Sequence, residues 1–269
     1  MSRVDAQDEP HDDLRAHRAT SFGSQAAAYA EHRPDYAGAA VDWAVEPVRG
    51  RDQLRVLDLG AGTGKLTAAI ARLAGPPDVR VVAVEPDPAM LAELRRGQPE
   101  VTALPGRAED IPLPDASVDA VLCGQAAHWF TMDLAVPEIA RVLTPGGIFA
   151  GLWNMADDRE DWVAGLGRVC PQSATWSGWT AEPHDWPGSA HGSAYFGPAS
   201  RAEFEHGRLR TADSLVATIA THSRQLVMDP AERSGQLDRV RAYLMSRPET
   251  ARGEFRMPML TGVLRSVKI

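Results

Sequence analysis

Short apolar runs alternate with helical patterns through the middle of this chain, and that alternation constrains the fold more than any other feature. The runs predict strands at residues 56–59, 79–84, 101–103, 118–123 and 148–153. Strands that alternate with helices predict a parallel sheet with helices on both faces. The runs are almost continuously apolar, as is typical of strands that are buried on both faces.

Periodicity and capping residues predict where the helices lie. Before residue 150, helices are expected at 24–32, 36–45, 66–73, 88–97 and 134–143. Asp87 is the predicted N-cap of the helix 88–97, with Pro88 at its first position. Pro137 is expected in the first turn of the helix 134–143. Farther on, helices are expected at 157–169, 214–222 and 230–245, and strands at 203–210 and 263–268.

The turn after the first strand, VLDLGAGTGKLT at residues 56–67, packs three glycines into five positions. Such turns hold phosphates, dinucleotides or other small cofactors. A phosphate-binding P-loop would need glycine in place of Leu59 and a hydroxyl residue in place of Leu66. The dinucleotide fingerprint would need glycine in place of Lys65, although the acidic residue expected about 20 residues later exists as Glu85. The P-loop therefore fails at two positions, and the dinucleotide fingerprint fits in part.

A third pattern is an acidic residue followed by G-x-G-x-G, which is the pattern of turns that hold S-adenosylmethionine. Every position matches, with Asp58, Gly60, Gly62 and Gly64. This cofactor has no pyrophosphate to seat on a helix N-terminus. It carries an amino-acid zwitterion and a sulfonium cation, so a carboxylate near the turn is useful. Glycines let the backbone approach closely, and Glu85 would accept hydrogen bonds from both ribose hydroxyls.

Three further segments follow the glycine turn in a fixed order. They are VAVEPDPAML at 82–91, GRAEDIPLPDASVDAVLC at 106–123 and EIARVLTPGGIFA at 138–150. The set resembles class I S-adenosylmethionine-dependent methyltransferases, most of all the small-molecule branch of ubiquinone-biosynthesis-like and trans-aconitate-methyltransferase-like enzymes. The resemblance covers about residues 20–155 and, more loosely, the rest. It implies an α/β, Rossmann-like, doubly wound sheet of seven strands, mostly parallel with an antiparallel last strand, under an N-terminal helical lid.

The resemblance also implies which residues hold the cofactor. Asp58 and the glycine turn would lie at the methionine end, Glu85 at the ribose, and Arg33 would pair with the cofactor carboxylate. The expected cofactor-binding residues are Tyr29, Arg33, Asp58, Gly60, Ala61, Gly62, Glu85, Pro86, Met90, Ala108, Glu109, Gly124 and Gln125.

His128, Trp129 and Phe130 follow the fourth strand, where related enzymes bind the acceptor. His128 is either a catalytic base or a packing element, and the sequence favours neither. Trp129 and Phe130 are expected to contact the acceptor. Asp119, inside the fourth strand, is expected to have a structural role near the glycine turn.

Five of the seven tryptophans fall in residues 153–186, which begin at the end of the fifth strand. An aromatic acceptor pocket is one interpretation, with Trp153 and Trp179 as its expected lining. Packing within a lid is the other, and it applies to most of the five.

Composition indicates which classes of binding partner are expected. A formal net charge of −8 without a long Lys/Arg cluster argues against nucleic acid. Two cysteines, and histidines without ligand spacing, predict no metal site. Neither a signal peptide nor a run of ~18 apolar residues occurs, so a cytoplasmic location and no membrane partner are expected. The expected partner is a small-molecule acceptor, and the expected assembly is a monomer or homodimer.

These patterns predict four parts of one domain: a flexible arm at 1–20, a helical lid at 21–50, a cofactor-binding core at 51–155, and a substrate-covering part at 156–269 that adds the last strands. The expected function is methyl transfer from S-adenosylmethionine to O, N or C of a small organic acceptor, including aromatic secondary metabolites, with S-adenosylhomocysteine as product. The alternatives are a nicotinamide-dependent oxidoreductase, against which Lys65 argues, and a non-catalytic S-adenosylmethionine-binding protein.

Overall fold

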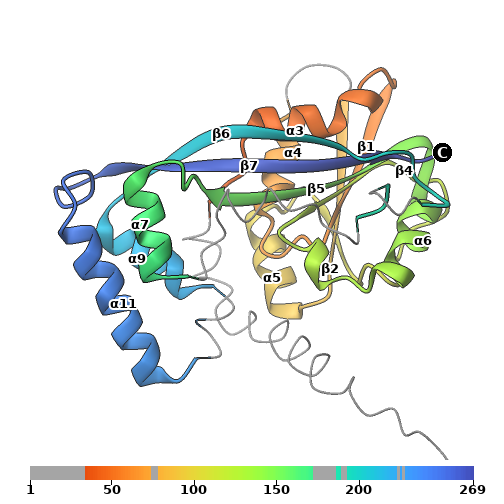
Figure 1. The fold of residues 1–269 in the computed structure, drawn as a ribbon. Helices are drawn as coiled ribbons and strands as arrows, with labels where there is room; N and C mark the ends of the chain where they lie inside the picture. Colours follow the sequence, from red (N-terminus) through yellow and green to blue (C-terminus); the bar gives the residue numbers. More distant parts are fainter. Residues whose placement is uncertain (1–33, 74–77, 172–185, 189–192, 223–224, 226–227) are drawn as a thin grey trace, which may run out of the picture.

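The computed structural model describes residues 34–73, 78–171, 186–188, 193–222, 225 and 228–269. Their centre is a seven-stranded sheet with the order β3-β2-β1-β4-β5-β7-β6 (Figure 1). The first five strands pair in parallel, and β7 runs antiparallel to β5 and β6. The predicted Rossmann-like sheet with an antiparallel last strand is confirmed. The strands are β1 (Gln53–Leu59), β2 (Asp78–Glu85), β3 (Thr102–Pro105), β4 (Val118–Gly124), β5 (Leu143–Ala156), β6 (Ser200–Arg210) and β7 (Phe255–Val267).

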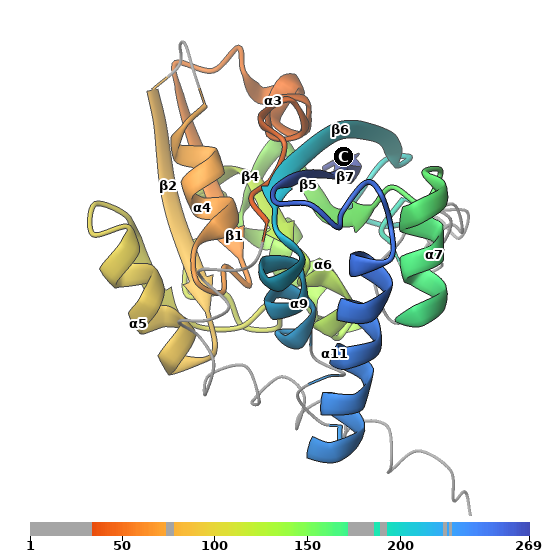
Figure 2. The ribbon, with the colours of Figure 1, turned by 90° about the vertical axis from the view of Figure 1, so that its left-hand side faces the viewer.

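Helices cover both faces of the sheet (Figure 1 and Figure 2). On one face α3 (Gly38–Val45) and α4 (Lys65–Ala71) pack against β1, β4 and β5, and the short helix η2 (Glu46–Val48) follows α3. On the other face α6 (Met132–Val142) packs against the same three strands. The helix α5 (Pro88–Gly97) packs at the β2–β3 edge and is capped by Asp87 as predicted. This is the doubly wound arrangement that the alternating pattern predicts.

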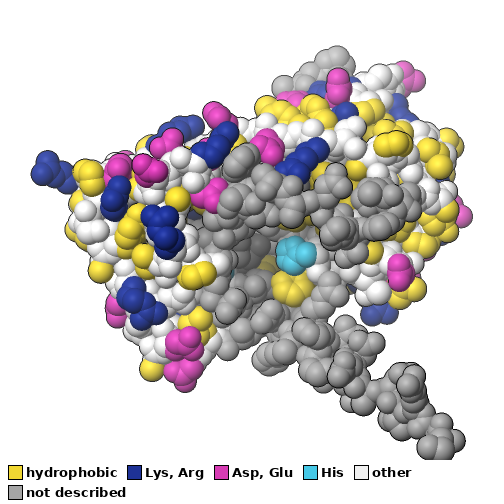
Figure 3. Space-filling model, in the orientation of Figure 1, with side chains coloured by type: hydrophobic (Ala, Val, Ile, Leu, Met, Phe, Trp, Pro, Cys, Tyr) yellow, Lys and Arg dark blue, Asp and Glu magenta, His cyan; other side chains and the backbone are white. Residues whose placement is uncertain are grey.

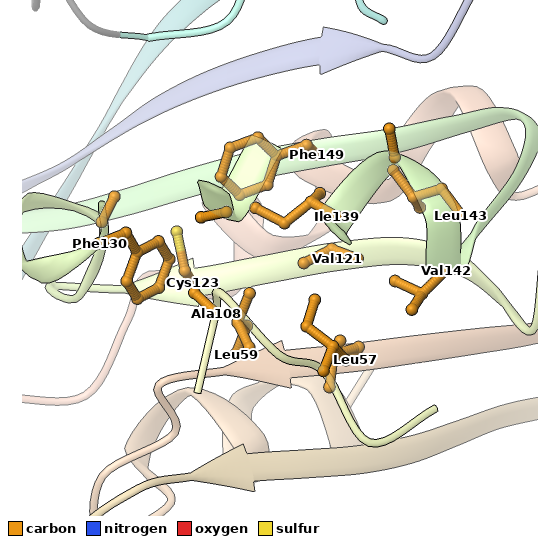
Figure 4. Packing of buried hydrophobic residues seen from close by; sticks show 14 of the residues in the cluster. Leu57, Leu59, Ala108, Val121, Cys123, Phe130, Ile139, Val142, Leu143 and Phe149 are labelled. Atoms are coloured by element: carbon orange, nitrogen blue, oxygen red, sulfur yellow. The ribbon is translucent and has the colours of Figure 1, made fainter. Parts of the chain in front are cut away.

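The core between the sheet and α6 is apolar (Figure 4). Alternate residues of each strand point to this face, because side chains along a strand have a period of two. Burying each such side chain stabilises the fold by about 1.5–3 kcal/mol relative to leaving it exposed. Cys123 lies here as a buried small hydrophobe. The strand residues of this core are Leu57, Leu59, Val121, Cys123 and Phe149, and Ile139 and Val142 come from α6.

A separate helical group packs against the far ends of β6 and β7. It consists of α7 (Asp161–Val169), α9 (Ala212–Ala220) and α11 (Pro230–Met245), which lie side by side at one end of the molecule (Figure 1 and Figure 2). A capping box at Thr211 and Ser214 begins α9, and the Asp229 carboxylate caps α11. Their apolar faces form one cluster with the β7 residues Phe255 and Met257.

Some element boundaries differ from those predicted. The strand β7 begins at Phe255 instead of residue 263, because pairing with β6 and β5 overrides the Pro258 and Gly262 that interrupt its pattern. The helix α6 begins at Met132, so Pro137 lies in its second turn, and the first-turn prediction is wrong. The helix α7 begins at Asp161 instead of residue 157. The helix predicted at 24–32 lies outside the described residues.

Asp119 lies at the amino end of β4, opposite the glycine turn. Its Oδ1 accepts hydrogen bonds from Arg51 Nη1 at 2.6 Å and Arg55 Nη2 at 2.9 Å. Burial alone would raise the pKa of this carboxyl, but the hydrogen bonds and charges of the two arginines hold it below its usual value. The predicted place near the glycine turn is wrong, because the parallel register sets Ala120 beside Val56 and Leu122 beside Asp58, so Asp119 lies before the carboxyl end of β1 at which the turn begins.

Candidate active site

A cavity of about 620 Å³ lies at the carboxyl ends of β1, β2, β4 and β5. This is the edge at which open parallel sheets bind ligands. Its lining includes the glycine turn after β1, Glu85 at the end of β2, and the short helix η3 (Ala127–Trp129) after β4. In Figure 3 a histidine and apolar side chains lie near the centre of the visible face.

The glycine turn has a left-handed backbone at each glycine. The φ angle is 69° at Gly60, 57° at Gly62 and 87° at Gly64, in the region that L side chains rarely adopt. A Cβ at Gly60 would lie 2.8 Å from Cβ of Ala126, whereas one at Gly62 would meet nothing within 4 Å. The Gly60 N–H donates to the Val84 carbonyl at 2.9 Å. The turn is therefore fixed to β2 and presents bare backbone to the cavity.

Asp58, next to last in β1, is fully buried and lines the cavity. Its Oδ2 accepts a hydrogen bond from Thr67 Oγ1 at 2.6 Å, while Oδ1 has no hydrogen-bond partner among the described residues. Burial raises the pKa of Asp58 to about 7; the Thr67 hydrogen bond lowers it, and the Glu85 charge raises it. A buried acceptor without a partner costs free energy. A cationic or N–H donor in the cavity would remove that cost.

Glu85 ends β2 and fixes two loops. Its Oε2 accepts from the Gly62 N–H at 2.8 Å, and its Oε1 accepts from the Asp87 N–H at 2.9 Å. Burial raises the pKa of Glu85, and the two backbone hydrogen bonds partly oppose that rise. Each carboxylate oxygen has a second acceptor position. The side chain can therefore accept two further bonds, as from a pair of neighbouring hydroxyls.

Four further residues that were expected to bind the cofactor line the same cavity. Met90 and Ala108 are buried, and Pro86 and Glu109 lie with them on the lining. Glu109 Oε1 accepts a hydrogen bond from the Thr131 N–H at 2.7 Å. That bond ties the segment after β3 to the start of α6.

The end of β4 carries a strained residue. Gln125 has a φ of 55°, which is rare for a non-glycine residue and costs about 1–3 kcal/mol. Two hydrogen bonds hold it, from its N–H to the Leu152 carbonyl at 2.9 Å and from Nε2 to the Asn154 carbonyl at 2.7 Å. A Cβ at Gly124 would overlap the hydroxyl of Tyr36. Both features bring the backbone of this strand end close to the cavity.

His128 and Trp129 lie in η3 on the cavity wall. Their ring centroids are 4.8 Å apart at an interplanar angle of 47°. Phe130 also lines the cavity, but it is only 8% exposed and belongs to the core. The imidazole of His128 is exposed to the cavity, where a base would have to be, and it also packs on Trp129. The geometry is compatible with either predicted role.

Trp153 does not line the cavity. Its ring packs edge-on against Trp186, with centroids 5.7 Å apart, because its side chain points to the sheet face opposite that of Leu152. Tyr29, Arg33 and Trp179 lie outside the described residues. All other predicted site residues line this cavity: Asp58, Gly60, Ala61, Gly62, Glu85, Pro86, Met90, Ala108, Glu109, Gly124, Gln125, His128, Trp129 and Phe130.

The site lies in a segment with known relatives. Residues 57–151 match the family described as "Methyltransferase domain". The chain is 38% identical over 247 residues to an uncharacterized methyltransferase of Mycobacterium tuberculosis, a match that covers 91% of this chain and 95% of that protein. This chain belongs to the methyltransferase family. The protein is accordingly an enzyme of the transferase class.

Solved structures agree with that assignment. A proposed type II methyltransferase from Anaeromyxobacter dehalogenans matches with a TM-score of 0.56 and 26% identity, over 88% of this chain and 97% of that one. The YcgJ protein of Bacillus subtilis matches with a TM-score of 0.51 and 23% identity, over 86% of this chain and 99% of that one. The methyltransferase has the class I S-adenosylmethionine-dependent fold.

The cavity of the methyltransferase has two halves. The motif half is the lining from Asp58 to Phe130, described above. The helical half is the lining from Asn154 to Met259, and none of its residues was predicted as a site residue. Its residues come from β5, β6, β7, α7 and α9, so only the folded sheet brings them together. Most of them are apolar: Met155, Ala156, Val163, Leu166, Leu215, Ile219, Met257 and Met259.

Asn154 stands at the border of the two halves and is the centre of a buried polar network. Its Oδ1 accepts from Thr261 Oγ1 at 2.7 Å and lies 3.2 Å from His206 Nε2. Its Nδ2 donates to the Asp35 carbonyl at 3.1 Å, and Thr261 Oγ1 accepts from the Ala37 N–H at 3.2 Å. The network ties residues 35–37 to β5 and β7. An asparagine within an apolar strand was the sequence signal for it.

Charged side chains of both signs are intermixed on the face of the methyltransferase seen in Figure 3. Within the described ranges, no group of three or more His, Cys, Asp or Glu side chains is arranged to hold a metal ion. In the same part of the chain, no helix has both the length and the apolar character that crossing a membrane requires.

Proposed function

We propose that this methyltransferase transfers a methyl group from S-adenosylmethionine to a small organic acceptor. The motif half would hold the cofactor and the helical half the acceptor. The observation that carries the proposal is the buried carboxyl of the lining residue Asp58, beside the glycine turn, whose Oδ1 has no hydrogen-bond partner among the described residues. With Glu85 on the same wall, it makes this edge acidic. An acidic edge attracts a cationic cofactor and repels the pyrophosphate of a dinucleotide.

The residues present fit this cofactor. Asp58 Oδ1 would accept a hydrogen bond from its ammonium group, and Glu85 from the ribose hydroxyls. Met90 and Ala108 supply apolar surface for the adenine. The open backbone at Gly62 leaves room for close approach. When bound, the cofactor supplies an electrophilic methyl group on its sulfonium.

The protein's contribution to catalysis would be positioning and the exclusion of water. The helical half is apolar and joins the motif half in one cavity, so an acceptor there faces the cofactor-binding edge. Trp129 would form a wall for it. A total volume of about 620 Å³, shared with the cofactor, supports a small acceptor over a macromolecular one.

A product assay tests the proposal. The protein would be incubated with S-adenosylmethionine and a library of small acids, amines and phenols, and S-adenosylhomocysteine and methylated products would be measured by mass spectrometry. We expect turnover by the wild type, none by Asp58→Ala, and near-normal turnover by Asp110→Ala as the matched control. Tight S-adenosylmethionine binding without turnover of any compound would favour a binding protein. Hydride transfer with NAD would favour the oxidoreductase.

The role of His128 can be separated from packing once an acceptor is known. As a base, His128 would be needed only by an acceptor atom that must lose a proton. His128→Gln, which keeps a polar side chain of similar length, should then lower kcat by ~10²–10⁴-fold for a protonated acceptor and leave S-adenosylhomocysteine affinity unchanged. A normal kcat with such an acceptor would assign His128 to packing against Trp129.

A further inference from the structure

Arg210 is a buried cation on the wall of the helical half. It is the last residue of β6, directly before the cap of α9, and its relative exposure is 6%. It nevertheless lines the cavity.

The charges that line the cavity are unevenly distributed. The acidic lining residues all belong to the motif half, which also has two basic ones: Asp58, Glu85, Asp87 and Glu109, with Lys65 and Arg107. Among the described lining residues of the helical half there is no Asp or Glu, and Arg210 is the one Arg or Lys, with the imidazole of His222 as the other titratable group. Among its described lining residues the helical half therefore has a guanidinium and no carboxylate. An anionic group of a molecule bound in this half would meet Arg210.

The surroundings of Arg210 strengthen its attraction for an anion. Leu215, Ile219, Met257 and Met259 line the same half. Burial and, to a smaller extent, the charge of Arg208 lower the pKa of Arg210 to about 10, while Asp35 partly opposes this. The guanidinium stays charged at neutral pH, but it is poorly solvated. Coulomb attraction to an anion is stronger in such a medium than in water.

We propose that Arg210 binds a carboxylate of the acceptor, so that the acceptor is an organic acid with an apolar body. This inference rests on the proposed function. The planar guanidinium can donate two parallel hydrogen bonds to a carboxylate. The methionines and aliphatic residues would cover the apolar body, since methionine adapts to irregular shapes.

The carboxylate at Arg210 is the anchor of the acceptor and not the atom that receives the methyl group. An ion pair withdraws electron density from the carboxylate and makes it a weaker nucleophile. A different atom of the acceptor must therefore face the motif half. Arg210 is a specificity residue that selects acids and sets their orientation.

Matched acids and amides test this. Calorimetric titrations of the protein saturated with S-adenosylhomocysteine would use indole-3-acetate against indole-3-acetamide, and octanoate against octanamide. At least one acid should bind the wild type about tenfold or more tightly than its amide. Arg210→Met should abolish that preference, Arg210→Lys should keep part of it, and Met259→Leu should keep all of it. Equal affinities in both pairs, no binding by either acid, or a preference that survives in Arg210→Met would overturn the proposal.

Two measurements distinguish a failure of the Arg210 proposal from misfolding of a variant and from a failure of the proposed function. The S-adenosylhomocysteine affinity and the Tm of each variant are recorded first, and Arg210→Gln replaces Arg210→Met if the latter does not fold. A wild type that fails to bind S-adenosylhomocysteine would count against the proposed function. A wild type that binds it but shows no preference for acids would count against Arg210 alone.

Discussion

Two buried aspartates lie at opposite ends of the same pair of strands, and their surroundings differ. Asp119, at the amino edge of the sheet, accepts hydrogen bonds from Arg51, Arg55 and Thr144. Asp58, at the carboxyl edge, has one hydrogen bond, from Thr67, and an oxygen without a partner among the described residues. The pKa of Asp119 lies below its ordinary value, and that of Asp58 is raised to about 7.

The difference separates a structural carboxylate from a binding one. Asp119 has its partners within the fold, so its charge stabilises the native state. Asp58 is held where its charge is costly, and strained or unsatisfied groups of this kind gather at functional sites. Matched substitutions of the two residues therefore test whether Asp119 is structural and Asp58 binds the cofactor.

The largest expected effect is on cofactor affinity. Asp58→Asn should weaken S-adenosylhomocysteine binding by about 100-fold or more, because the ammonium group would lose a buried charged acceptor. Asp119→Asn should change that affinity less than about threefold, since it lies at the other edge of the sheet. Calorimetric titration of both variants measures this. Comparable losses in the two variants would end the distinction between the edges.

The free energy of unfolding should show the reverse order, with the larger loss in Asp119→Asn. Asp119→Asn should lower the free energy of unfolding by about 2–3 kcal/mol at pH 7, because it breaks charged hydrogen bonds to two arginines. Since the folded pKa of Asp119 is lowered, this loss should be full above about pH 4 and shrink below it. Urea unfolding at pH 7 and pH 3 checks both points. A loss that is equal at the two pH values would contradict the ion-pair explanation.

Asp58 should affect stability with the opposite sign. Its folded pKa is raised, so the folded state holds this proton more tightly than the unfolded chain does, and its contribution is lost as pH rises through about 7. Asp58→Asn should therefore be more stable than the wild type at pH 8 by about 1 kcal/mol or more, and closer to it at pH 5. Urea unfolding without cofactor tests this, and a destabilised variant at pH 8 would contradict it.

A smaller effect is expected at Glu85. Glu85→Gln keeps the shape and one acceptor oxygen but loses the charge and the other acceptor. We expect S-adenosylhomocysteine affinity to fall about 10–30-fold. Asp87→Ala is the control, because this residue caps α5 and its loss should cost about 1 kcal/mol of stability with little change in affinity. Equal affinity in wild type and Glu85→Gln would remove Glu85 from the ribose site.

The sequence indicated which residues line the motif half, because these residues stand in short motifs at the ends of the strands. Asp58, the glycine turn and Glu85 follow the ends of neighbouring parallel strands, and such ends meet at one edge of a sheet. The helical half could not be found in this way. Asn154 and Arg210 become neighbours of the site only through the pairing of β5, β7 and β6, whose register no local pattern specifies.

The expectations for Asp119 and Trp153 differ from the structure because both depend on how the strands are placed in the sheet. Asp119 was expected near the glycine turn, but strand direction and register put it at the far edge. Trp153 was expected in the acceptor pocket, yet the alternation of side chains along β5 turns it toward Trp186. The position along the strand decides which edge of the sheet Asp119 reaches, and the alternation of side chains decides which face Trp153 reaches.

The pH dependence of cofactor affinity tests the central claim most directly. If Asp58 receives the ammonium group, binding requires its ionised form, whose population rises as pH approaches the raised pKa of about 7. Between pH 5.5 and pH 7, where the amino group of S-adenosylhomocysteine stays protonated, wild-type affinity should rise about tenfold. Asp58→Asn should bind weakly and with the same affinity at both pH values. A wild-type affinity that does not change with pH, or a rise of the same size in Asp58→Asn, would contradict the account.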